Sequence, residues 1–216
     1  MQYTYCFWDL DGTLVDSSPS VTLSVQYALT QMGIDPPPTK DLLCFIGPPL
    51  VDAFSRYFGM SHEDAVKATE HYRVIYRAGN IFKCSVYDGI VELLQELNNA
   101  GIVCVLATCK PHEFANQILE HHGLSRYFQF VSGPEMDGTR NEKSEVIAYA
   151  AEHLGITDLS RILMVGDHTN DVLGAAHHGI DCAGVLWGFG SEESLRGAQA
   201  KYICKTPADL RKLLLP

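Results

Sequence analysis

Two carboxylates stand two residues apart in the segment Asp9-Leu10-Asp11-Gly12, which directly follows an apolar, strand-like start of the chain. In an extended backbone alternate side chains share a face, so Asp9 and Asp11 can act at one site. Such a pair suits nucleophilic phosphoryl transfer: Asp9 would attack phosphorus and form an aspartyl-phosphate, and Asp11 would pass a proton to the leaving oxygen. Gly12 would let the chain turn sharply. An ordinary polar turn after a strand is the alternative interpretation.

Further polar residues stand after later apolar runs of the sequence, namely Thr108, Lys143, Asp167 and Asp171. The carboxyl ends of parallel strands meet at one edge of a sheet, so these side chains are expected to converge there. The expected convergence carries the argument, because each position alone has an ordinary explanation. A hydroxyl that caps a turn, a solvated lysine and an Asp that caps a helix are all common.

Three of the acidic residues, Asp9, Asp167 and Asp171, would form the hard-oxygen site that Mg²⁺ prefers. Without a cation these carboxylates would repel one another and also a phosphate dianion, and a bound Mg²⁺ would balance that charge. Thr108 would offer a hydroxyl and an N–H group to a phosphoryl oxygen, and Lys143 would supply a compact positive charge.

Apolar runs and glycines predict the order of elements. A first strand is expected at Tyr3–Asp9, followed by a largely helical region from about Pro19 to Phe82. From Gly89 on, strands and helices alternate. The expected strands are 102–107, 128–131, 162–165, 183–186 and a short 201–204. The expected helices are 20–32, 50–57, 62–76, 89–100, 112–122, 143–154, 171–178 and 207–214, with Ser61 as a cap of the third.

Alternation of strands and helices, with glycine closing nearly every helix, is typical of a doubly wound parallel sheet. The unbroken apolar runs fit strands that are buried on both faces. We therefore expect an α/β fold with a Rossmann-like core formed by residues 1–15 and 86–216. The helical stretch 16–85 interrupts this alternation, which predicts an inserted α-helical cap domain over the carboxyl ends of the strands.

Composition narrows the class of protein. The chain has 216 residues, 46% of them hydrophobic, which suffices for one domain with a small insertion. Its net charge of −10 disfavours nucleic-acid partners but not a small phosphorylated substrate, because local cations dominate at short range. Seven cysteines without a Cys-x-x-Cys motif disfavour a disulfide framework or a zinc site. No signal peptide or membrane-length apolar run is evident, so we expect a cytoplasmic protein without membrane contacts.

The motifs Asp9-Leu10-Asp11-Gly12-Thr13-Leu14, Ala107-Thr108, Lys143 and Val165-Gly166-Asp167-His168-Thr169-Asn170-Asp171 resemble, in order and spacing, the four motifs of the haloacid dehalogenase-like hydrolase superfamily. The resemblance covers essentially the whole chain. The helical stretch is similar to the small α-helical cap of that superfamily. The segments Phe45–Leu50 and Gly184–Ser191 are similar to its phosphoglycolate phosphatase-like branch, which includes bacterial proteins called phosphoglycolate phosphatases or 5′-nucleotidases.

This resemblance implies a phosphatase, a Mg²⁺-dependent phosphomonoester hydrolase that acts on a small phosphorylated metabolite through an aspartyl-phosphate. It implies that Asp9 is the nucleophile and a metal ligand, and that Asp11 is the acid/base and binds the metal through its carbonyl. It further implies the following roles: phosphoryl binding by Thr108 and Lys143, metal binding by Asp167 and Asp171, and phosphate or substrate contacts by Gly12 and Lys110.

Some positions depart from the family pattern. His168 stands where many relatives carry Arg or Lys, and Lys143 lacks the usual Lys-Pro-x-Pro context, so Arg140 is a second candidate for the phosphate-binding cation. Cys109, which follows Thr108, is expected to be a buried, inert thiol.

Other activities remain open at this point. The resemblance favours a phosphoglycolate phosphatase-like activity, and the alternatives are a 5′-nucleotidase and a β-phosphoglucomutase-like phosphomutase, which would share the same intermediate. A dehalogenase is disfavoured by the presence of Asp11, and a pure binding module by the intact catalytic set. The sequence leaves open whether the protein is a monomer or a homodimer.

Overall fold

The computed structural model describes residues 2–215. The chain forms two compact units: a core unit, Met1–Val15 with Val86–Pro216, and a helical unit, Asp16–Ser85. The strands β2 (Val15–Asp16) and β3 (Ser85–Val86) pair with each other where the chain passes from one unit to the other. Within the described residues, no helix is both long and apolar enough to cross a membrane.

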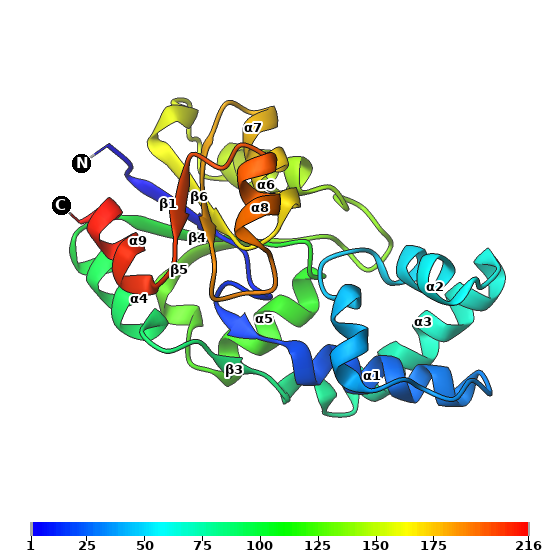
Figure 1. The fold of residues 1–216 in the computed structure, drawn as a ribbon. Helices are drawn as coiled ribbons and strands as arrows, with labels where there is room; N and C mark the ends of the chain where they lie inside the picture. Colours follow the sequence, from blue (N-terminus) through cyan, green and yellow to red (C-terminus); the bar gives the residue numbers. More distant parts are fainter. Residues whose placement is uncertain (1, 216) are drawn as a thin grey trace. The chain divides into compact units, whose positions relative to one another are not determined.

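A six-stranded parallel sheet forms the centre of the core unit, with the strand order β5-β4-β1-β6-β7-β8 (Figure 1). Its strands are β1 (Tyr5–Trp8), β4 (Val103–Ala107), β5 (Phe128–Ser132), β6 (Ile162–Gly166), β7 (Asp181–Val185) and β8 (Tyr202–Cys204). The chain enters the sheet at β1, builds outward to β5, and then returns to the other side of β1 with β6. This order confirms the predicted doubly wound α/β fold.

Helices cover both faces of this sheet. They are α4 (Ile90–Asn99), α5 (His112–His121), α6 (Lys143–His153), α7 (Thr169–His177), α8 (Glu192–Gly197) and α9 (Pro207–Leu214). Figure 1 shows α6, α7 and α8 on one side of the sheet and α4 and α9 on the other. On the first side, Phe7 and Met164 of the sheet are fully buried in one apolar cluster with Val146 of α6 and Val172 of α7. Burial on both faces explains why the strands read as unbroken apolar runs.

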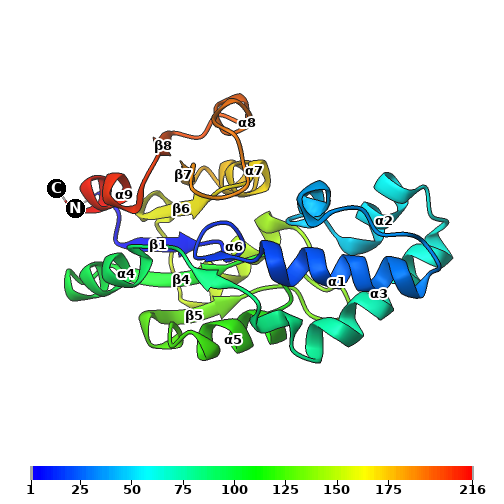
Figure 2. The same cartoon turned by 60° about the horizontal axis from the view of Figure 1, so that its bottom comes forward.

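The helical unit consists of α1 (Ser18–Gln31), α2 (Leu50–Phe58) and α3 (His62–Arg77), with the 3₁₀ turns η1 (Thr39–Phe45) and η2 (Asn80–Phe82). Figure 2 shows α1 and α3 side by side, and they are in contact. The hydroxyl of Ser61 accepts a hydrogen bond from the backbone N–H of Asp64 at 3.1 Å, which confirms the predicted cap of α3.

Element boundaries agree with the sequence-based expectations within a few residues, with two differences. The helix expected from Asp171 begins at Thr169, because His168 rather than Asp171 caps it. The short helix α8, the two-residue strands β2 and β3, and the 3₁₀ turns, which also include η3 (Ser125–Tyr127) and η4 (Leu159–Arg161), were not predicted. These segments are too short to show an apolar period.

Gly174 of α7 offers a test of the packing between α6 and α7. A Cβ at this position would lie 2.6 Å from Cγ of Lys143 and 3.1 Å from the backbone nitrogen of Ser144. We expect Gly174→Ala to lower the free energy of unfolding by about 1–3 kcal/mol, measured by urea titration, because the added methyl group overpacks the contact. Gly197 of α8 is the matched control, since its Cβ would meet nothing within 4 Å. Equal effects of Gly174→Ala and Gly197→Ala would contradict this account.

Candidate active site

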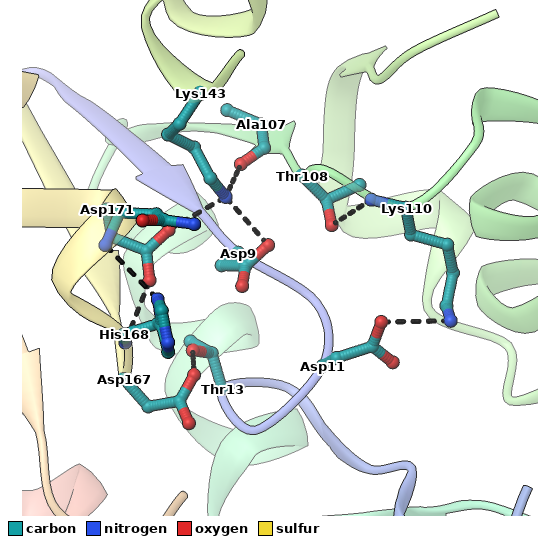
Figure 3. Close-up of polar contacts among 11 residues, drawn as sticks. Asp9, Asp11, Thr13, Ala107, Thr108, Lys110, Lys143, Asp167, His168 and Asp171 are labelled. Carbon is teal, nitrogen blue, oxygen red and sulfur yellow. Dashed lines mark hydrogen bonds and ion pairs between the residues drawn. The ribbon is translucent and has the colours of Figure 1, made fainter. Parts of the chain in front are cut away.

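The order of the sheet brings the predicted site residues to one edge. In the register of the parallel strands, Trp8 of β1 lies between Leu106 of β4 and Val165 of β6. The segments that leave these neighbouring strands therefore start side by side, and they carry Asp9, Thr108 and Asp167. Figure 3 shows these side chains gathered with Lys143 and Asp171 around the end of β1. The predicted convergence is thus observed, whereas the roles of the individual residues stay predictions.

Lys143, the first residue of α6, is the buried cation of this cluster, with only 5% of its surface exposed. Its ammonium group donates hydrogen bonds to Oδ1 of Asp9 and to the carbonyl of Ala107, both at 2.9 Å, and lies 2.7 Å from Oδ1 of Asp171. Burial opposes the charge, but the two carboxylates outweigh burial and raise the pKa of Lys143 well above its usual value. The lysine therefore stays protonated at neutral pH.

Asp171 is fully buried in the first turn of α7. One carboxylate oxygen pairs with Lys143, and the other accepts a hydrogen bond from the backbone N–H of His168 at 3.0 Å. Burial raises the pKa of Asp171, although Lys143 opposes this shift. Both oxygens thus have a partner within the protein, and Asp171 helps to fix the position of Lys143.

The surroundings of Asp167 strongly disfavour the charged form of its carboxylate. The residue is 2% exposed, and burial, together with Asp171 and Asp9, raises the pKa of Asp167 to about 8. Two donors offset part of this cost: the backbone N–H of Phe189 at 2.7 Å and, more weakly, the hydroxyl of Thr13 at 3.4 Å. A nearby cation would stabilise the charged form of Asp167.

The acidic cluster fits a divalent cation by its donor chemistry. Asp9, Asp167 and Asp171 each offer a carboxylate oxygen, and these three atoms lie within 4.8 Å of one another. Hard oxygen ligands of this kind suit Mg²⁺. The raised pKa of Asp167 is consistent with this, because burial first and the carboxylates of Asp171 and Asp9 second disfavour its charged form, which a bound cation would stabilise.

Asp11 and Lys110 form a second ion pair next to this cluster. Nζ of Lys110 lies 2.9 Å from Oδ2 of Asp11, and both side chains are largely buried. The backbone N–H of Lys110 donates to the hydroxyl of Thr108 at 3.1 Å, which ties the turn after β4 together. Thr108 is 1% exposed. In this structure Lys110 thus contacts Asp11, and its expected contact with phosphate or substrate stays a prediction.

Gly12 has a positive φ of 77°, as the predicted sharp turn requires. A side chain at this position would collide with the carboxylate of Asp167. The glycine thus serves the close approach of two loops, and its predicted substrate contact stays a prediction.

Arg140 does not take the place of Lys143. It pairs with Glu135, and its guanidinium lies 4.1 Å from the ring centroid of Tyr149. Cys109 is partly rather than fully buried, and burial raises the pKa of its thiol to about 11. The thiol is therefore protonated at neutral pH, in agreement with the expected lack of reactivity.

Sequence reasoning missed the support given by residues 186–190, which follow β7. Besides the Phe189 N–H bond to Asp167, the indole N–H of Trp187 donates to the carbonyl of Thr13 at 2.9 Å. A side chain at Gly188 or Gly190 would collide with the loops that carry Gly12 and Asp167. Two glycines around an aromatic residue after a strand were the available signal, since such spacing permits a close backbone approach.

A carboxylate thus lies beside a buried cation, and a second carboxylate follows two residues further along the chain. Comparison with known proteins identifies the family of the chain. The model of the family described as haloacid dehalogenase-like hydrolase matches residues 6–185. The chain belongs to this family. Several relatives and solved structures carry phosphatase or nucleotidase names, and the chain is a haloacid dehalogenase-like phosphatase.

Several relatives match nearly the full chain. A 5′-nucleotidase of Pseudomonas aeruginosa is 41% identical over 99% of this chain and 96% of its own length. A phosphoglycolate phosphatase of Caulobacter vibrioides is 29% identical over 95% of this chain and 88% of its own. The tyrosine-protein kinase PtkA of Mycobacterium tuberculosis is 40% identical over 85% of this chain but only 62% of its own length.

Among solved structures, a predicted phosphatase from Clostridium acetobutylicum has a TM-score of 0.94 and 40% identity. The match covers 100% of this chain and 99% of that chain. The phosphatase fold therefore extends through both units of the chain.

The raised pKa of Asp167 predicts a pH-dependent stability in the absence of metal. The folded state binds this proton more tightly than the unfolded state, so the free energy of unfolding falls as pH rises from about 4 to about 8. We expect Asp167→Asn to remove this contribution. Measured by urea titration in EDTA, the gain in stability over the wild type should be near zero at the acid end of this range and reach a few kcal/mol above it.

Asp35→Asn is the matched control, because Asp35 is exposed in the helical unit. A gain in stability of Asp167→Asn that does not change with pH would contradict the assignment of the raised pKa to this carboxylate.

Proposed function

We propose that this phosphatase is a Mg²⁺-dependent phosphomonoester hydrolase that works through an aspartyl-phosphate on Asp9. The observation that carries the proposal is the hydrogen bond between Lys143 and Oδ1 of Asp9, inside a cluster where Asp11 lies two residues further along. A buried carboxylate beside a fixed cation is suited to attack an anionic phosphoryl group, because the cation reduces the repulsion between them.

In the first half-reaction, an oxygen of Asp9 forms a bond to phosphorus while the bond between phosphorus and the leaving oxygen breaks. Asp11 gives its proton to that leaving oxygen. Lys143 and Thr108 hold the phosphoryl oxygens, the lysine by charge and the threonine by its hydroxyl. The backbone N–H of Thr108, which was expected to share this role, instead donates to the carbonyl of Ser132 at 3.1 Å.

In the second half-reaction, Asp11 takes a proton from a water molecule as the water oxygen attacks phosphorus. The bond between phosphorus and Asp9 breaks, inorganic phosphate leaves, and Asp11 is again protonated for the next cycle. Each carboxylate therefore returns to its starting state.

The metal site in this proposal comprises Asp9 and Asp167, with Asp171 and the backbone carbonyl of Asp11 as supporting groups. When bound, Mg²⁺ neutralises the excess negative charge of the cluster and stabilises charge on the phosphoryl oxygens. Asp167 is held for this purpose by Phe189 and Thr13.

Two substrate classes follow from the relatives. The 5′-nucleotidase relative aligns with nearly the whole chain at higher identity than the phosphoglycolate phosphatase, so we place nucleoside 5′-monophosphates first and phosphoglycolate second. The helical unit, residues 16–85, acts in this proposal as the cap that selects the leaving group and excludes water. The kinase PtkA contributes no substrate class to this proposal, because the match covers only 62% of its length.

Phosphate release from a panel of substrates tests the proposed activity. The panel contains nucleoside 5′-monophosphates, phosphoglycolate and sugar phosphates, each with Mg²⁺ and with EDTA. We expect metal-dependent turnover of one class well above the others. Conversion of a sugar phosphate to its isomer without phosphate release would indicate a mutase, and inactivity of the folded protein on every substrate would refute the proposal.

The nucleophile is tested by Asp9→Asn, which keeps the shape of the side chain but removes its charge. We expect kcat to fall by at least about 10³-fold, because no covalent intermediate can form. The melting temperature shows whether the variant is folded, and Asp35→Asn serves as the control carboxylate. Retention of wild-type kcat by Asp9→Asn would exclude Asp9 as the nucleophile.

A further inference from the structure

Lys110 is a buried lysine in the turn after β4 that the proposed mechanism does not use. Only 9% of the residue is exposed, and its ammonium group lies 2.9 Å from Oδ2 of Asp11. Removing a lysine from water is costly unless a charged partner compensates. The carboxylate of Asp11 is such a partner, so the geometry ties the function of Lys110 to that of Asp11.

The two carboxylate oxygens of Asp11 have different surroundings. Oδ2 is held by Lys110, whereas Oδ1 is buried and has no hydrogen-bond partner among the described residues. Buried polar atoms are rarely left without a partner, and the exceptions often have a catalytic role. Oδ1 is thus the oxygen of Asp11 that no hydrogen-bond donor among the described residues occupies.

We propose that Lys110 is a positioning residue, which holds Oδ2 of Asp11 so that Oδ1 faces the leaving oxygen of the substrate and then the attacking water. This inference rests on the proposed function, because it takes the acid/base role of Asp11 from there. In this proposal Lys110 acts on Asp11, whereas the resemblance implied a phosphate or substrate contact for Lys110. The cation at the nucleophile is Lys143, and Figure 3 shows Lys110 directed toward Asp11 instead.

The fold explains why this pair forms. Asp11 and Lys110 follow β1 and β4, which are hydrogen-bonded neighbours in the sheet. The N–H of Lys110 is bound by the hydroxyl of Thr108, so the lysine extends from a turn that is itself fixed. Two rigid connections therefore hold the carboxylate, and charge-assisted pairing adds directionality.

Proton balance requires no change at Lys110. In the first half-reaction the proton moves from Oδ1 of Asp11 to the leaving oxygen as the bond to phosphorus breaks. In the second, Oδ1 takes a proton from the attacking water. Lys110 keeps its protons throughout: it holds Oδ2 by an ion pair while Asp11 is ionised, and by a hydrogen bond to the same oxygen while Oδ1 carries the proton.

The leaving group provides the test. An alkyl phosphate needs a proton on its leaving oxygen, whereas p-nitrophenyl phosphate releases a stable anion and needs little help. We expect Lys110→Gln to lower kcat/KM for the best alkyl phosphate of the panel by about 30-fold or more, and for p-nitrophenyl phosphate by less than about 3-fold. Lys110→Arg should restore part of the activity on the alkyl phosphate, and the exposed Lys205→Gln serves as the control.

A double variant shows whether Lys110 acts through Asp11. If it does, Lys110→Gln should cause no further loss of kcat/KM in an Asp11→Asn background. Equal losses on both substrates, no loss on either, or a multiplicative loss in the double variant would each overturn the proposal. Melting temperatures establish whether each variant is folded. If Lys110→Gln is not folded, Lys110→Arg provides the test instead.

Failure of the proposed function itself gives a different result. In that case the wild-type protein releases no phosphate from either substrate, or Asp11→Asn shows no dependence on the leaving group. If the wild-type protein does release phosphate and Asp11→Asn does show the dependence on the leaving group, a negative result for Lys110→Gln refutes only the positioning role.

Discussion

A single buried lysine has to balance three carboxylates that lie within 4.8 Å of one another, and the remaining features of the site follow from this imbalance. Lys143 compensates Asp9 and Asp171, whereas burial, together with these two carboxylates, raises the pKa of Asp167 to about 8. Hydrogen bonds from neighbouring loops offset only part of this shift. An added cation would stabilise the charged form of such a cluster, which is why the proposed function places Mg²⁺ there.

The parallel sheet makes this concentration of charge feasible. Three neighbouring strands end at the same edge, and the backbone there supplies N–H donors and close approaches that no isolated loop could maintain. Gly12, Gly188 and Gly190 let the loops touch without side chains between them. The carboxylates are therefore held by the rigid part of the protein, while residues 16–85 form a separate unit with its own buried side chains.

The sequence was sufficient to predict the sheet, the helices and the convergence of the acidic residues, because periodicity and strand ends are local signals. It was not sufficient to decide whether Lys143 or Arg140 lies beside Asp9. The two residues are only three positions apart, and the direction of each side chain depends on where α6 begins. The pairing of Lys110 with Asp11 and the support of Asp167 by Phe189 also depend on the paths of loops far apart in the chain. Such contacts have no local pattern and become visible only in three dimensions.

The central place of β1 has a consequence for biosynthesis. Its two neighbours, Val103–Ala107 and Ile162–Gly166, leave the ribosome long after β1 itself. Asp9 is thus among the first residues to be made, yet the lysine and the carboxylates around it come from the second half of the chain. Non-local strand pairing of this kind is slow, and nascent chains tend to complete local units first. A ribosome-bound fragment that ends just before β6 therefore contains Asp9 and Lys143 but lacks Asp167 and Asp171, so the acidic cluster cannot form until β6 and the first turn of α7 have been made.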